Sequence, residues 1–226
     1  MSGTDYVGFV DVGFLKAEGA RLLGVKPALV RPDAPAVVEW FKGLDCGAVD
    51  GARFVRAYWY DGAFDPGHRE YQGQRQFFNH IASTPGVQLR LGHIAERAPR
   101  LEKPILGAIR AAGASVGVDS DQLLAEFRKR WTFYPERQQK GVDTLVALDL
   151  VRLASRGNLG TAVLLAGDRD LAEAVRAAQD FGQRVVVATP LRQSLARELE
   201  QLADEVLDLD EAVVRAMLKF RTVPAA

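Results

Sequence analysis

The chain has 226 residues, of which 48% are hydrophobic and 26% charged, so it has enough apolar material for a packed core and is not wholly disordered. Lysine plus arginine and aspartate plus glutamate number 29 each, which gives a formal net charge of zero. A basic coat for nucleic acid is therefore excluded, and any phosphate-binding surface has to be local.

Short apolar runs alternate with helical spacing of apolar residues through the first half of the chain. In chain order we expect a strand at 6–10, helices at 14–23 and 34–44, a strand at 54–60, a turn at Asp61-Gly62, a helix at 71–82 and a strand at 87–94. The glycine at 24 and the Pro-Gly pair at 85–86 end two of these helices.

The second half opens with residues 95–140, a stretch that is long for a connection and contains a helical piece at 121–131. After it we expect a helix at 142–154, a strand at 162–165, a helix at 171–181, a strand at 185–188, a helix at 195–202, a short edge strand at 206–207 and a helix at 211–220. This alternation predicts an α/β fold with a mainly parallel sheet of about five strands and helices on both faces. We expect one domain, 1–226, with 95–140 inserted in it as a helical subdomain.

Basic and aromatic side chains concentrate in this insertion. The run comprises Arg128, Lys129, Arg130 and Trp131, followed by Phe133 and Tyr134. Charge and stacking of this kind can hold single-stranded RNA. The alternative is a small subdomain whose aromatic side chains form its own core and whose charges face water.

Aspartates follow several of the predicted strands. Asp11 ends the first strand, Asp168 and Asp170 follow the fourth, and Asp143 opens the helix after the insertion. The carboxyl ends of parallel strands share one edge of a sheet, so these carboxylates should converge. Like charges held close together raise one another's pKa unless a cation joins them, and Mg²⁺ or Mn²⁺ takes oxygen ligands. The pattern fits metal-assisted phosphodiester hydrolysis.

Each acid also has a structural interpretation. Asp168, Asp170 and Asp143 can cap helices, and Asp61 is an ordinary turn residue. From spacing alone both interpretations stay open. Asp149 lies about 240° around the helix from Asp143, so we expect it to pack or cap rather than to join this site.

Five segments in this order resemble the NYN domain family of PIN-like nucleases, especially its bacterial branch. They are FVDVGFL at 9–15, YWYDG at 58–62, RLG at 90–92, QKGVD at 139–143 and LLAGDRDL at 164–171. The resemblance covers nearly the whole chain except 95–138. It implies a PIN-like three-layer sandwich that binds Mg²⁺ or Mn²⁺ and cleaves RNA.

The resemblance also implies roles for individual residues. Asp11, Asp143 and Asp168 correspond to metal-binding catalytic acids, and Asp170 is a fourth catalytic acid that holds a second ion or a water. From the sequence itself, Lys140 precedes the acidic helix start and can neutralise a phosphate. Arg128, Lys129 and Arg130 are the other candidate substrate-binding residues.

Two departures from the family pattern leave a second function open. Phe14 stands where many members have Asn, and Ala166 stands where many have Ser, so two polar groups that could position substrate are missing. The alternative is a catalytically degenerate module that binds RNA or protein. A phosphatase of the haloacid dehalogenase type is disfavoured, because it needs a second Asp at the position of Gly13.

The remaining expectations concern partners and location. RNA is the expected partner, no membrane partner is expected, and a homo-oligomer is left open. The single cysteine, Cys46, cannot form an internal disulfide, and the chain opens without a basic, cleavable leader. No apolar run approaches the roughly 20 residues that span a bilayer, so we expect a cytoplasmic protein.

Overall fold

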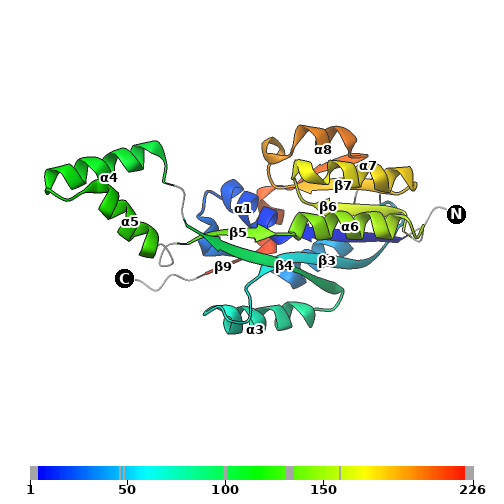
Figure 1. Cartoon of the computed structure of the whole chain (residues 1–226). Coiled ribbons are helices and arrows are strands. Elements are labelled where there is room, and N and C mark those ends of the chain that lie inside the picture. Colours follow the sequence, from blue (N-terminus) through cyan, green and yellow to red (C-terminus); the bar gives the residue numbers. More distant parts are fainter. Residues whose placement is uncertain are drawn as a thin grey trace. The chain divides into compact units, whose positions relative to one another are not determined.

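A computed structural model describes residues 5–45, 47, 49–98, 101–130, 135–157 and 159–221. Its contacts divide the chain into one unit made of Met1–His93 and Gly141–Ala226, and a second unit, Ile94–Lys140. Figure 1 labels most of the elements. The strands are β1 (Asp5–Asp11), β2 (Val30–Pro32), β3 (Arg53–Ala63), β4 (Val87–Arg97), β5 (Glu136–Lys140), β6 (Thr161–Leu165), β7 (Arg184–Thr189), β8 (Glu205–Asp208) and β9 (Leu218–Phe220). The α-helices are α1 (Val12–Leu22), α2 (Ala34–Lys42), α3 (Tyr71–Ala82), α4 (Lys103–Ser115), α5 (Ser120–Arg130), α6 (Val142–Ala154), α7 (Ala172–Asp180), α8 (Arg197–Leu202) and α9 (Glu211–Met217).

The main sheet has the strand order β5-β4-β3-β1-β6-β7-β8, and the pairs from β4 to β8 are parallel. The α/β class and the mainly parallel sheet are therefore confirmed. The described sheet has seven strands rather than about five, because the edge strand at 206–207 joins it as β8 and the polar segment 136–140 joins it as β5. The β5 segment, ERQQK, has no apolar alternation that would have predicted a strand.

Alternate residues of the buried strands supply the two faces of this sheet. On β1, Tyr6 and Val10 pack in one core, and Val7 and Phe9 pack in the other. The first core includes residues of α1, α2 and α9, and the second includes residues of α6, α7 and α8. Helices thus cover both faces, which is the layer order of a PIN-like sandwich.

Gly8 shows how closely one helix approaches the sheet. A Cβ atom at this position would lie 2.3 Å from the ring of buried Phe41 on α2. That ring also stacks on Phe54 at 5.4 Å between centroids. A glycine is required here because the space above β1 is filled by an aromatic ring.

Two sequence predictions about single elements were wrong, and one helix was missed. Asp61 lies inside β3 rather than in a turn, because β3 continues to Ala63 in register with β4. The last predicted helix ends at Met217, and Leu218–Phe220 forms β9, which pairs antiparallel with β2. Helix α4 was not predicted at all.

The second unit, Ile94–Lys140, contains helices α4 and α5, which pack against each other with Leu124 buried. The sequence analysis placed its insertion at 95–140. Two ion pairs join the end of β4 to β5 within this unit: Arg97 with Glu136 and Arg137 with Glu96, each at 3.0 Å. Trp131, Phe133 and Tyr134 lie outside the described residues.

Candidate functional site

The candidate acids lie at the point of the sheet where the strand order reverses. From β1 the chain builds outward through β3 and β4 on one side, and through β6, β7 and β8 on the other. Ligands of open α/β sheets bind at such a switch point, beyond the carboxyl ends of the strands. Asp11 is the last residue of β1, and Asp168 follows the end of its neighbour β6 by three residues.

Local backbone hydrogen bonds fix two of these acids. The Asp11 side chain caps α1 by accepting a hydrogen bond from the Phe14 N–H at 3.0 Å, and the Asp168 side chain accepts one from the Asp170 N–H at 3.0 Å. The sequence analysis gave Asp11 no capping role, although α1 begins at the next residue, Val12. A carboxylate has two oxygens, so a cap leaves acceptor capacity for a ligand.

Asp143 is not a cap. The N-cap of α6 is Gly141, whose φ of 76° lies in the left-handed region, and Asp143 lies in the first helical turn. This position suits an acid because the N-terminal end of a helix carries partial positive charge. The capping interpretation therefore holds for Asp168 and fails for Asp143.

The four acids interact electrostatically. The pKa of Asp11 is raised to about 6, mainly by burial and to a smaller extent by the charges of Asp143 and Asp168, while hydrogen bonds from the Phe14 and Gly13 N–H groups oppose the rise. Burial raises the pKa of Asp143 as well, with contributions from the charges of Asp168 and Asp170. The carboxylates that the sequence analysis expected to converge thus repel one another when they are ionised.

This electrostatic arrangement suits a divalent cation. Within the described ranges, no three His, Cys, Asp or Glu side chains are already disposed around one point as metal ligands. Mg²⁺ needs only one or two carboxylates, because it usually retains several of its waters. Carboxylate oxygens are donors that such a hard ion prefers, so Asp11, Asp143 and Asp168, whose charges act on one another, fit it as a donor set.

Phe14 lies directly beside this site. A Cβ atom at Gly167 would lie 2.3 Å from the Phe14 ring, so the ring rests against the backbone that leads to Asp168. Phe14 is half-buried, and its neighbour Ala166 is buried. At Phe14 an apolar ring of α1 therefore lies against the segment after β6, where many family members have a polar group.

We expect Phe14→Asn to lower the free energy of unfolding by about 1–2 kcal/mol, less than the 3 kcal/mol or more lost at a fully buried Phe. The reason is that part of the ring is already exposed. Urea denaturation of the variant checks this, with Phe181→Asn as the control for a Phe that is 55% exposed. A loss above 3 kcal/mol would contradict the half-buried position.

The candidate substrate-binding residues of the second unit are exposed. Arg128, Lys129 and Arg130 lie in the last turn of α5, and Lys140 ends β5. Glu126 pairs with Lys129 at 2.7 Å and with Arg130 at 3.8 Å, so part of this charge is neutralised within its own helix. Arg128 has no ion pair with any described residue, so its charge is the least compensated of the three.

A buried charge cluster holds α6 against the sheet. Asp149 on α6 is 7% exposed and accepts hydrogen bonds from the Arg90 Nε at 2.8 Å and the Tyr60 hydroxyl at 3.1 Å. Arg152 pairs with its other oxygen at 3.3 Å. The expectation that Asp149 serves packing agrees with this, but sequence reasoning missed Arg90 and Tyr60, because their sequence spacing gives no sign of the contact.

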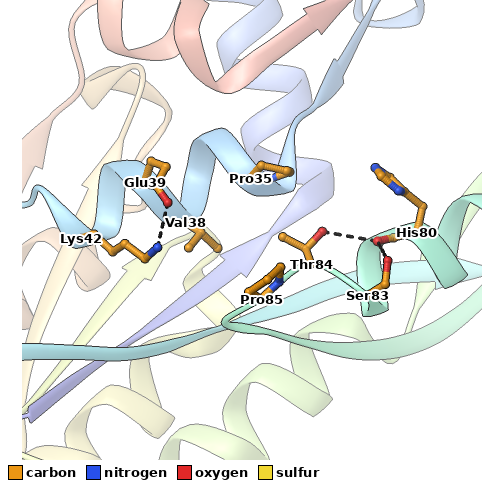
Figure 2. A pocket seen from close by; sticks show the side chains of 8 residues that line it. All are labelled: Pro35, Val38, Glu39, Lys42, His80, Ser83, Thr84 and Pro85. Atoms are coloured by element: carbon orange, nitrogen blue, oxygen red, sulfur yellow. Dashed lines mark hydrogen bonds and ion pairs between the residues drawn. The ribbon is translucent and has the colours of Figure 1, made fainter.

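A separate hollow of about 310 Å³ lies between α2 and the turn after α3 (Figure 2). Its charged residues, Glu39 and Lys42, pair with each other at 2.8 Å. The hydroxyls of Ser83 and Thr84 both donate to the carbonyl of His80, at 2.8 and 3.3 Å. Its paired charges and its hydroxyls thus have partners within the protein, so we do not regard it as the reactive site.

None of the described helices combines the length and the apolar character that crossing a membrane requires.

Comparison with known proteins assigns the fold family. The model of the NYN domain matches residues 25–210, a range that includes Asp143, Asp168 and Asp170 but begins after Asp11. An uncharacterized protein, y4oD, of Sinorhizobium fredii is 40% identical over 88 residues, which are 38% of this chain and 41% of that protein. The match thus spans about two-fifths of the relative's length.

One solved structure shares the overall architecture. It is a protein of unknown function, VPA0982, from Vibrio parahaemolyticus, with a TM-score of 0.54 and 16% sequence identity. The likeness covers 96% of this chain and 98% of the other. At this identity the likeness shows the fold alone.

Proposed function

Because the chain belongs to the NYN domain family, a group of PIN-like nuclease-type modules, we propose that it is a metal-dependent ribonuclease acting in the cytoplasm. The observation that supports this most strongly is the electrostatic coupling of Asp11, Asp143 and Asp168 at the switch point of the sheet. Burial, together with neighbouring charges, raises the pKa of Asp11 and of Asp143, and carboxyl groups perturbed in this way are typical of functional sites.

Asp11, Asp143 and Asp168 would hold Mg²⁺ or Mn²⁺, and Asp170 would orient a water or hold a second ion. A bound ion would lower the pKa of a water molecule and neutralise the charge that develops at phosphorus. The protein's own contribution is to fix the carboxylates. Asp11 and Asp168 are held by backbone N–H groups, and Asp143 is held by the first turn of α6.

RNA is the proposed substrate. In the second unit, Lys140 and the exposed run Arg128, Lys129 and Arg130 would contact its phosphates. Basic side chains that release counterions from phosphates give such binding a strong dependence on salt.

The second candidate function is a catalytically degenerate module that binds RNA or protein. The observation that favours it is the Phe14 ring against Gly167, where a polar orienting group would otherwise reach the acids. A degenerate module would bind its partner without cleaving it.

A cleavage assay on mixed RNAs with Asp143→Asn separates the two functions. We expect wild type to cleave RNA only with added Mg²⁺ or Mn²⁺, and Asp143→Asn to lose this activity while keeping its shape. Metal at a hundredfold excess over its Kd should raise the stability of wild type by about 2.7 kcal/mol and that of the variant much less. Asp180→Asn, an exposed acid at the end of α7, is the matched control and should behave as wild type.

Cleavage by Asp143→Asn at the wild-type rate would refute the proposed site. Equal metal responses in thermal unfolding of the two proteins would also refute it. RNA binding by wild type with no cleavage under any metal would identify the degenerate module.

A further inference from the structure

Four arginines gather on the face of the sheet that α6 covers, toward the edge opposite the acids. They line a hollow of about 380 Å³ formed by the start of β3, the start of β4 and the end of α6. The arginines are Arg56, Arg90, Arg152 and Arg156. The residues described as lining this hollow include no carboxylate, although the chain as a whole has zero net charge.

The only carboxylate that pairs with these arginines in the described structure is Asp149, which is bound by both Arg90 and Arg152. Arg56 donates to the side-chain oxygen of Gln88 at 3.2 Å, a neutral partner. Arg156 has no ion pair within the described part of the chain and is exposed. Three positive charges therefore remain uncompensated in a small space.

An irregularity in β3 directs one arginine into the hollow. The register between β1 and β3 shifts between Tyr6 and Val7, so β3 contains one extra residue there. As a result Val55 and the next residue, Arg56, both line the hollow, although consecutive residues of a regular strand point to opposite faces. A bulge of this kind re-aims a side chain.

A second hollow of about 600 Å³ continues along α6 and shares Arg90 and Arg152 with the first. Its other lining residues are Leu145, Leu148, Val151 and Asp149, the carboxylate already paired with Arg90 and Arg152, and Leu148 is 62% exposed. Leu145 is two residues from Asp143. The two hollows form one groove, which we call the α6 groove, with apolar residues near the acids and arginines at the far end.

We propose that the α6 groove binds a single RNA strand, with backbone phosphates on Arg56 and Arg156 and bases against the apolar part of α6. The planar guanidinium fork matches a phosphate, and single-stranded nucleic acid binds where a basic track runs beside apolar or aromatic side chains. Asp143 and Arg152 are about 14 Å apart along the helix axis. A strand of a few nucleotides therefore reaches both the acids and the arginines.

The proposal rests on the proposed function only in that the strand is RNA, so binding is measured without cleavage. The probe is a fluorescent single-stranded RNA of about twenty nucleotides, titrated with the full chain in chelator at several salt concentrations. The double variant Arg56→Gln with Arg156→Gln removes two charges and leaves the Asp149 cluster intact. The matched control, Arg69→Gln with Arg176→Gln, also removes two exposed charges. Arg69 lies just before α3 and Arg176 lies on α7.

We expect the double variant to bind roughly tenfold more weakly at 0.1 M salt, and its log–log salt slope to fall by about 1.4, or 0.7 for each lost phosphate contact. The control should bind as wild type. Leu148→Glu should also weaken binding, and Leu148→Gln much less, because only the first adds a negative charge to the groove.

Unchanged affinity and slope in the double variant would overturn the proposal. Polyglutamate that competes as well as RNA would identify a site for acidic protein instead, and inorganic phosphate or a mononucleotide that competes fully would identify a site for a free small anion. If Asp143→Asn loses cleavage while RNA affinity still depends on Arg56 and Arg156, the groove proposal stands. If the wild type cleaves RNA but its RNA affinity does not depend on Arg56 and Arg156, the groove proposal is refuted and the proposed nuclease function is not.

Discussion

Asp149→Ala is expected to lower the free energy of unfolding by about 3 kcal/mol, because removing one partner of a buried ion pair leaves the other charge uncompensated. The Arg90 side chain is only 27% exposed, and the Tyr60 hydroxyl beside it is buried. Burial and the Asp149 charge raise the pKa of Tyr60, so the phenol stays protonated and would lose its acceptor. For a chain of this length the loss corresponds to about 6–12 °C in Tm.

Thermal and urea unfolding of three variants measures this effect. Arg152→Ala is the matched control, since its side chain is 55% exposed and such surface pairs contribute about 0–1 kcal/mol. Asp149→Asn should lose less than Asp149→Ala, because its amide oxygen still accepts from Tyr60. If Asp149→Ala and Arg152→Ala lower the free energy of unfolding by the same small amount, Asp149 does not hold α6 to the sheet.

Asp11→Asn is expected to have the opposite effect at neutral pH, a gain of about 3 kcal/mol in metal-free protein. The pKa of Asp11 is about 6 in the folded protein, whereas the ordinary pKa of an aspartate is 3.8. The folded state therefore binds the proton more tightly, and ionisation of Asp11 opposes folding. Each unit of pKa difference corresponds to about 1.4 kcal/mol.

The pH dependence separates this effect from other causes. Below about pH 4 Asp11 is protonated in both states, so wild type and Asp11→Asn should be equally stable. Between about pH 4 and 6 the wild type loses stability relative to the variant, and above that the difference is complete. Asn also caps helices well, so the cap of α1 is retained. Urea unfolding in chelator at pH 4, 6 and 8 measures the difference, and a pH-independent difference would contradict the raised pKa.

Much of the parallel sheet could be predicted from the sequence, because its buried strands are short apolar runs that leave few alternatives. Segments 162–165 and 185–188 lie within β6 and β7. β5 and β9 could not be predicted in this way. β5 is polar throughout, and β9 continues directly from a helix, so both depend on a partner strand distant in the chain.

The same contrast holds for the candidate site. Asp11 and Asp168 follow buried strands, so topology alone brings them to one edge. The contacts of Asp149 with Arg90 and Tyr60 depend on how α6 lies over β3, which no local pattern records. The bulge that turns Arg56 into the α6 groove is likewise a property of strand pairing and not of the residue types at 54–56.

The central position of β1 determines when the fold can close during synthesis. Its first partner, β3, follows soon after it in the chain, but Val10 pairs on the other side with Leu165, which emerges only after the whole second unit. Until then one edge of the central strand has unpaired N–H and C=O groups, the state that favours aggregation of folding intermediates. Pairing across so long a stretch of chain also slows folding. A nascent chain stopped at the end of the insertion would therefore need protection of this open strand edge.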